Sequence, residues 1–166
     1  MGDRTMSSTL YVDSLIEKTS GNGVHIPGHV IQVAEDVISS DMTLSVGAGA
    51  ITINTINFTP KYSNSIIEIT ISHAQTTRVS AGGTASWLSV HTQLDGVNTN
   101  KIRTGALGYP EAHSDQRYTF SVTGQIPSWS GQKTLTHAAT VGSVGSNWII
   151  SHQNTPAGMF VRETAQ

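Results

Sequence analysis

Seven histidines are the residues of this chain best suited to metal or proton chemistry, because imidazole binds Zn²⁺ and titrates near neutral pH. His25 and His29 have the spacing that aligns two ligands on a helix, but Pro27 and Gly28 between them disfavour a helix. On a strand this spacing separates the two side chains by about 13 Å, too far for one ion. The others lie in separate segments: His73, His91, His113, His137 and His152. We expect no metal and no cofactor within one chain; the alternative is a ring of three histidines on a trimer axis.

Glu111, His113 and Asp115 share one long loop, residues 104–117, and their side chains are of the types used for acid–base catalysis. A solvated surface loop explains the same residues equally simply. No nucleophile or phosphate-binding motif accompanies them, and the turn at residues 47–52 lacks the third glycine and the helix of a dinucleotide loop. We therefore predict that the protein is not an enzyme, and a glycan hydrolase is the enzyme class weighed against this.

Several aromatic side chains could stack on a sugar, although most aromatic residues of β-sandwiches belong to the core. Trp129, in a Pro-Ser-Trp-Ser-Gly turn, is the best candidate for exposure. The long loop 104–117 is a second candidate, because loops on a rigid scaffold often carry recognition. The candidate residues for surface recognition are Tyr109, Glu111, His113 and Trp129.

The charge of the chain is low, since 12% of its residues are charged and the formal net charge is −2. The nine basic residues form no cluster, and this excludes nucleic acid as an expected partner. The first residues lack the apolar run of a signal peptide, and no stretch has the length of a membrane span. Cysteine is absent, which fits assembly in a cytoplasm. We expect a protein without a membrane partner.

Alternation of apolar and polar residues dominates from Gly28 onward and predicts strands. The apolar face changes between Ile53 and Ile56, which predicts a bulge near Thr55. Asp95-Gly96 predicts a hairpin turn. The fold class is therefore all-β, an antiparallel jelly-roll sandwich of about eight strands with a short N-terminal arm.

Uncharged Ser, Thr and Asn faces suit packing between subunits, because they bury no unpaired charge, and symmetric assembly covers the edges of sheets. We expect the apolar face of two alternating segments to contribute to a trimer interface. The candidate interface residues are Ile67, Ile69, Ile71, Tyr118 and Phe120.

Residues 1–27 are predicted to form an attachment arm with a hinge, and residues 28–166 the jelly-roll domain. Residues 10–16 combine a weak helical pattern with short extended pieces. Gly21 and Gly23 then allow a turn, and Pro27 stiffens the entry into the domain. An ordinary N-terminal strand preceded by a loop is the alternative. The candidate attachment residues are Leu10, Val12, Leu15, Ile16, Ile26 and Pro27.

Three segments, about a third of the chain, resemble short bacteriophage virion proteins of the decoration, head-fibre and short tail-fibre types. They are the segment LYVDSLIEKTSGNGVHIPGHVIQV at residues 10–33, the segment INFTPKYSNSIIEITI at residues 56–71 and the closing strand AGMFVRETAQ at residues 157–166. The resemblance implies a tumour-necrosis-factor-like jelly roll that forms a homotrimer. Arg162 and Thr164 depart from the more apolar closing strand of such domains, and this puts the packing of the trimer in doubt.

From this resemblance we expect a virion protein assembled in the host cytoplasm, most simply a capsid decoration (cement) or head-fibre protein. Its arm would bind a phage capsid or tail protein, and its jelly roll would project outward. The chain has no repeated shaft of the kind that a long tail fibre carries. The alternative is the tip of a short tail fibre that binds a receptor or a host-surface glycan.

Overall fold

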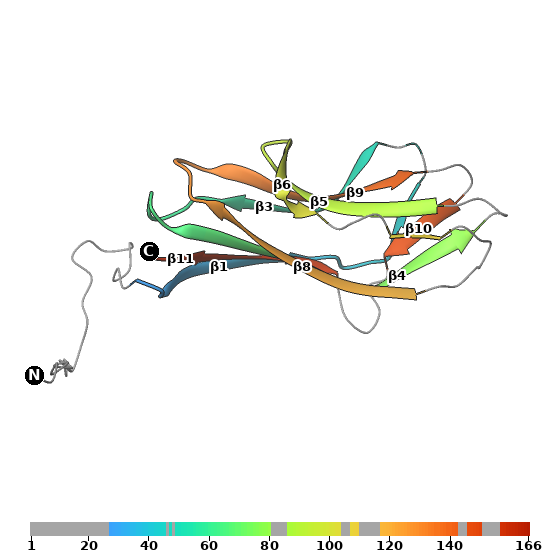
Figure 1. Cartoon of the computed structure of the whole chain (residues 1–166), viewed down its shortest axis with the longest axis horizontal. Coiled ribbons are helices and arrows are strands. Elements are labelled where there is room, and N and C mark those ends of the chain that lie inside the picture. The colour runs from blue at the N-terminus through green and yellow to red at the C-terminus, as the bar shows by residue number, and fades with distance from the viewer. Residues whose placement is uncertain are drawn as a thin grey trace, which may run out of the picture.

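Two antiparallel β-sheets pack face to face in the computed structural model (Figure 1). The structure describes residues 27–45, 47, 49–80, 86–103, 107–109, 117–142, 146–150 and 157–166. Within these ranges there are eleven strands and no helix, which confirms the all-β sandwich. The number exceeds the predicted one because strands of three residues are too short to show alternation.

The first sheet has six strands in the order β1-β11-β4-β10-β2, with β8 also paired to β4. Its strands are β1 (Val30–Val37), β2 (Met42–Leu44), β4 (Ile66–Ser80), β8 (Arg117–Pro127), β10 (Ser146–Ile150) and β11 (Gly158–Thr164). The long strand β4 connects the other strands of this sheet. β11 and then β10 pair along one of its edges, and β8 pairs along the opposite edge.

The second sheet has five strands in the order β3-β9-β5-β6, with β7 also paired to β5. Its strands are β3 (Ala50–Phe58), β5 (Ser86–Leu94), β6 (Val97–Arg103), β7 (Leu107–Tyr109) and β9 (Lys133–Gly142). The predicted hairpin between β5 and β6 is confirmed: Asp95 has φ 50° and Gly96 has φ 79°, the left-handed values that a tight Asp-Gly turn requires.

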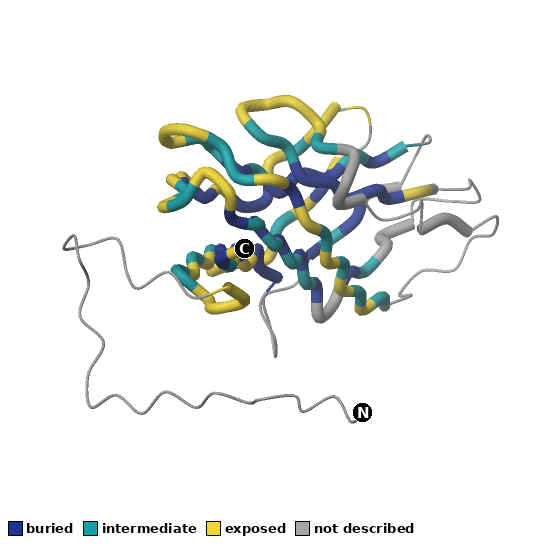
Figure 2. The backbone as a smooth tube through the Cα atoms, turned by 60° about the vertical axis from the view of Figure 1, so that its left-hand side comes forward, coloured by how far each residue is buried: buried dark blue, intermediate teal, exposed yellow. Residues whose placement is uncertain are grey.

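The core lies between the two sheets, as the burial pattern along the chain shows (Figure 2). It consists of two hydrophobic clusters, one at each end of the sandwich. Trp148 and Leu88 belong to the first cluster, and Ile67 and Leu135 belong to the second. Alternation places these side chains inward because successive residues of a strand face opposite sides of its sheet.

We name the two ends of the sandwich the arm end, where the chain enters the first sheet, and the loop end, opposite to it (Figure 1). At the arm end β1 and β4 begin and β8 and β11 end. Here the amide of Gly28 donates to the carbonyl of Ala165 at 2.8 Å, and the amide of Ala165 donates to the carbonyl of His29 at 3.0 Å. The chain thus enters the first sheet beside its C-terminus. At the loop end β4 and β9 end and β5 and β10 begin.

Two β-bulges interrupt the alternation in the middle of the sandwich. In β3 the register shifts between Thr52 and Asn54, so Ile53 and Asn54 are both buried; this confirms the predicted bulge, slightly earlier than Thr55. In β4 the register shifts between His73 and Thr76. Residues three apart normally face opposite sides of a strand, but this bulge turns both side chains inward, where both are fully buried.

Candidate functional site

A groove of about 510 Å³ opens at the arm end, between the β5–β6 turn and the segment that joins β8 to β9. Its wall includes an indole, an ion pair, an amide and two hydroxyl groups. The lining residues that carry these groups are Trp129, Asp95, Lys133, Asn98, Thr99 and Ser128. Nζ of Lys133 lies 3.7 Å from Oδ2 of Asp95, while Oδ1 of Asp95 accepts a hydrogen bond from the amide of Thr134 at 2.9 Å. The turn is therefore held to the start of β9.

Trp129, the predicted exposed aromatic, is only half-buried at the rim of this groove. Its ring packs edge-on against Phe58 with a centroid distance of 6.0 Å and borders the hydrophobic cluster at the arm end. Its indole nitrogen is buried and has no hydrogen-bond partner among the described residues. Trp129 therefore packs against the core with one part of its ring and lines the groove with another part.

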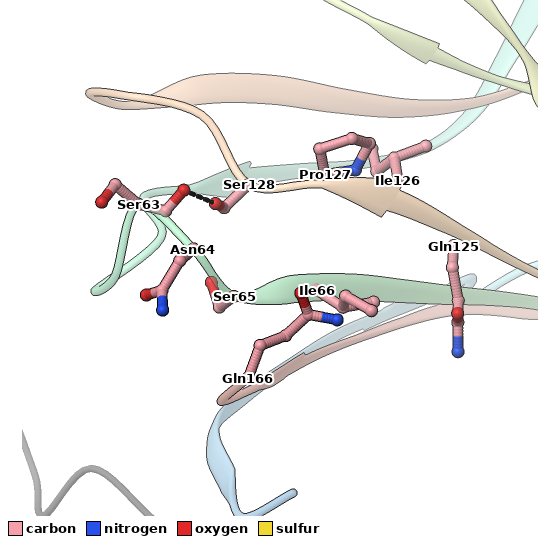
Figure 3. A pocket seen from close by; sticks show the side chains of 9 residues that line it. All are labelled: Ser63, Asn64, Ser65, Ile66, Gln125, Ile126, Pro127, Ser128 and Gln166. Atoms are coloured by element: carbon pink, nitrogen blue, oxygen red, sulfur yellow. Dashed lines mark hydrogen bonds between the residues drawn. The ribbon is translucent and has the colours of Figure 1, made fainter. Parts of the chain in front are cut away.

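A second pocket, of about 400 Å³, adjoins the groove and shares Ile126, Pro127 and Ser128 with it. Figure 3 shows the turn of Ser63 and Asn64 on one side and Gln166 on the other. The hydroxyl of Ser128 donates to the carbonyl of Ser63 at 2.6 Å, and this bond ties the β3–β4 connection to the end of β8. The side chains that line this pocket are polar or apolar but uncharged.

The buried carboxylate of Glu163 holds the β3–β4 connection through hydrogen bonds. It accepts hydrogen bonds from the amides of Lys61 and Tyr62 at 3.0 Å and from the hydroxyl of Ser65 at 2.6 Å. Gln32 of β1 donates a further bond through its side-chain amide. Burial favours the neutral acid, but these bonds outweigh it and lower the pKa of Glu163 below its ordinary value. The sequence analysis did not single out this residue.

The outer face of the first sheet carries three exposed apolar residues at its β1 edge, Val33, Val37 and Phe160, with the exposed Glu35 between the two valines and opposite Phe160. Val33 is 64% exposed, which is high for a branched apolar residue. Val37 and Phe160 lie over Gly158, where an added Cβ would come within 2.8 Å of Val37 and 3.2 Å of Phe160. We call these three residues the β1-edge patch.

Beside this patch the outer face is polar and its charges are largely paired. Thr70 and Thr123 share a hydrogen bond of 2.9 Å. Arg162 forms an ion pair with Glu68, and Gln125 donates to the same carboxylate. The departure of Arg162 from a more apolar closing strand is thereby explained, because the residue lies on the outer face and has a partner across the sheet.

The five residues predicted for the trimer interface face the inside of the sandwich. Ile67, Ile69 and Ile71 are completely buried within one chain. Tyr118 and Phe120 are partly buried and pack against the core clusters. The alternation was read correctly and places the three isoleucines on a buried face, while the composition of a trimer interface stays a prediction. The three isoleucines have no surface left for a neighbouring subunit.

The surface-recognition candidates do not come together in one site. Tyr109 lies in β7, which pairs with the beginning of β5 at the loop end, while Trp129 lies at the arm end. Glu111 and His113 fall outside the described residues, as do the attachment candidates Leu10, Val12, Leu15, Ile16 and Ile26. Pro27 is described and is exposed where the chain approaches β1.

The sequence analysis also missed a contact between two histidines that it had treated as separate. Nε2 of His73 in β4 lies 3.0 Å from Nε2 of His137 in β9, across the interior of the sandwich. The only signal was that both occupy inward positions of alternating segments. No group of three or more His, Asp or Glu residues that could hold a metal occurs in the described part of the chain.

Comparison with known proteins finds similarity only among solved structures. No family model matches the sequence, and no curated protein matches it. In the ranges that the structure covers, no helix is long and apolar enough to span a membrane.

Solved structures of similar fold include the C-terminal domain of EclA, titled a sugar-binding protein. The two share 14% identity with a TM-score of 0.36, over 84% of this chain and 87% of that chain. The VP2 subviral particle of infectious bursal disease virus has 14% identity and a TM-score of 0.38, over 81% of this chain and 37% of that chain. The Gt strain of the same virus has 12% identity and a TM-score of 0.40, over 95% of this chain and 43% of that chain.

The chain thus spans less than half the length of the virus chains that it matches. Its fold is distantly similar to that of VP2 in the subviral particle and to that of the EclA domain. A phage family remains a prediction from the sequence.

Proposed function

We propose that this protein is a homotrimeric structural protein of a phage virion, of the capsid decoration or head-fibre type, assembled in the host cytoplasm. The observation that carries the proposal is the β1-edge patch on the outer face of the first sheet. Exposed apolar residues gathered at an open sheet edge favour association with another protein surface. In a closed symmetric assembly, a second copy of the same chain covers the β1-edge patch.

The position of the chain ends supports the second part of the proposal, attachment through the arm. Gly28 and His29 are bonded to Ala165, so the chain enters the domain at the arm end. An arm that binds a capsid or tail protein would hold this end toward the particle. The loop end would then project away from it.

The first test is the native mass of the full-length protein by light scattering, for the wild type and for Val33→Glu. A trimer has a mass of about 53 kDa, three times the 17.6 kDa of one chain. Val33→Glu is expected to shift the mass toward one chain, because it adds a second carboxylate on the same face as Glu35 in the interface. Val97→Glu is the matched control, since Val97 is 69% exposed and lies on the β5–β6 hairpin of the other sheet.

Light scattering can contradict the proposal in two ways. A wild-type mass of one chain would remove the trimer, and an unchanged mass for Val33→Glu would remove the patch as its interface. Attachment is tested separately, by following whether the protein with and without residues 1–27 sediments with purified particles. Equal sedimentation of both forms would contradict a role of the arm.

The alternative function is receptor or glycan binding at the tip of a short tail fibre. It is favoured by the position of β7, which lies within loop 104–117 and pairs with the beginning of β5, and by β8, which begins beside the last part of β4; both lie at the loop end, opposite the arm end. Host adsorption that falls in a Glu111→Ala, His113→Ala double variant, but not in Trp129→Phe, would support this function. Unchanged adsorption of both variants, with no binder on a glycan array, would exclude it.

A further inference from the structure

A belt of polar side chains crosses the core and separates its two hydrophobic clusters. Along β9, His137 lies between Leu135 of one cluster and Ala139 of the other. Along β3, Asn54 lies between Ile53 and Ile56 in the same way. The belt consists of Asn54, His73, Thr76, Thr92 and His137, each of which is at most 3% exposed. Polar groups in such a place cost stability unless every one of them is hydrogen-bonded.

Four of these residues form one continuous chain of hydrogen bonds between the two sheets, which we call the histidine clasp. Thr76 bonds to Nδ1 of His73 at 3.2 Å, and Nε2 of His73 bonds to Nε2 of His137 at 3.0 Å. Nδ1 of His137 bonds to Oδ1 of Asn54 at 3.1 Å. Both bulges are needed, because one turns Thr76 inward and the other turns Asn54 inward.

The chemistry of the groups assigns every proton in the clasp. Oδ1 of Asn54 can only accept, so the proton of His137 is on Nδ1 and its Nε2 is bare. His73 must then carry its proton on Nε2 and donate it to His137. The bare Nδ1 of His73 accepts from the hydroxyl of Thr76. All three bonds require two neutral histidines, each in one tautomer.

Added protons are opposed by burial and, at the second step, by geometry as well. A first proton on His73 leaves the hydrogen bonds possible if the Thr76 hydroxyl turns, but it places a charge in the apolar interior. A second proton makes both facing nitrogens donors and breaks the contact between the sheets. Burial lowers the pKa of His73 to about 3, and burial together with His73 and His91 lowers the pKa of His137.

Among the described residues around the clasp, no acidic group raises the pKa of either histidine. From β8, the ring of Phe120 covers His73 at a centroid distance of 4.4 Å and carries no charge. From β5, His91 adds only a like charge when it is protonated. Asn54 from β3 is neutral. The charged groups that act on the two rings in this part of the chain are therefore histidines alone.

We propose that the histidine clasp is an acid-sensitive device that holds the two sheets together at neutral pH and lets the sandwich open in acid. The unfolded chain binds protons at its histidines below about pH 6.5, whereas the clasped histidines stay neutral. Stability is thus fully present above this pH and is lost as the pH falls toward the lowered folded values. The proposal is independent of the trimer and of the virion.

The test is the pH dependence of urea unfolding for the full-length protein between pH 7.5 and 5. With two protons taken up on unfolding, the unfolding constant of the wild type is expected to rise by up to about 100-fold per pH unit below pH 6.5. The His73→Gln, His137→Gln double variant replaces both rings by neutral amides and is expected to lose this rise. His29→Gln, at an exposed position, is the matched control and should follow the wild type.

Each result decides the proposal. A wild-type unfolding constant that is unchanged down to pH 5 overturns it, and so does an equal slope in the double variant, which would move the effect to His91 or another group. If the double variant does not fold, the ring proton resonances of the folded wild type replace it as a readout. Two histidines that remain neutral at pH 5 support the clasp, and seven that titrate near pH 6.5 overturn it.

Discussion

Glu163 in β11 and Ser65, the residue before β4, are joined by a hydrogen bond of 2.6 Å, from the serine hydroxyl to Oε1 of the carboxylate. The other groups that donate to this carboxylate are the amides of Lys61 and Tyr62 and the side chain of Gln32, all of them neutral. A buried charge is therefore held by hydrogen bonds from the β3–β4 connection and from β1. The contact closes the arm end between the last strand and the beginning of the long β4.

Glu163→Gln is predicted to lower the free energy of unfolding by about 2–3 kcal/mol, because one acceptor oxygen becomes an amide donor that faces backbone amides. Urea unfolding at pH 7 measures the change. Glu35→Gln, at an exposed position of β1, is the control and should change stability by less than about 0.5 kcal/mol. Equal effects of the two substitutions would mean that the hydrogen bonds to Glu163 contribute nothing.

The same carboxylate predicts a second, more acidic step in stability. Because the pKa of Glu163 is lowered in the folded state, its contribution is fully present above the ordinary glutamate value near pH 4.5 and is lost as the pH falls below it. In Glu163→Gln the loss of stability between pH 4.5 and 3 should be smaller than in the wild type. The histidine clasp begins to lose stability at a higher pH, near 6.5, but its range extends down to the pKa of His73 at about 3 and overlaps this one. The difference between Glu163→Gln and the wild type therefore isolates the contribution of the carboxylate.

Much of the fold followed from the sequence because alternation is a local property. Ile67, Ile69 and Ile71 were correctly placed on one face of a strand, and the turn at Asp95 was predicted from two residues. The bulge in β3 was visible as a change of phase between Ile53 and Ile56. Which face of a strand meets the other sheet depends on the whole arrangement, however, and so the isoleucines were assigned to an interface.

The clasp could not be predicted, since His73 and His137 are 64 residues apart and belong to different sheets. The bulge that turns Thr76 inward lies in a segment of small and polar residues, where alternation carries little signal. Glu163 gave no sign of its role either, because four neutral donors from distant segments replace the cation that a buried carboxylate would ordinarily require.

Thr92 carries the one belt hydroxyl that has no hydrogen-bond partner among the described residues. Thr92→Val keeps the shape of the side chain and removes this unpaired group, so it is predicted to stabilise the protein by about 1 kcal/mol. Thr76→Val is the matched comparison, because the Thr76 hydroxyl donates to His73; its loss should destabilise by about 1–3 kcal/mol. Thermal unfolding of both variants at pH 7.5 shows whether each substitution stabilises or destabilises the protein. Destabilisation by Thr92→Val would show that the hydroxyl has a partner, such as a buried water.

Trp87 lies directly over Gly142 on the neighbouring strand β9, where an added Cβ would come within 1.9 Å of its ring. Gly142→Ala must therefore displace the indole, and Trp87, already 37% exposed, can turn only toward solvent. The predicted cost is about 1–3 kcal/mol, with a red shift of the tryptophan emission. In a Trp87→Ala background the same substitution should be neutral or slightly stabilising, because alanine suits a strand better than glycine. A double-mutant cycle by urea unfolding isolates this difference, and an equal cost of Gly142→Ala in both backgrounds would refute the contact.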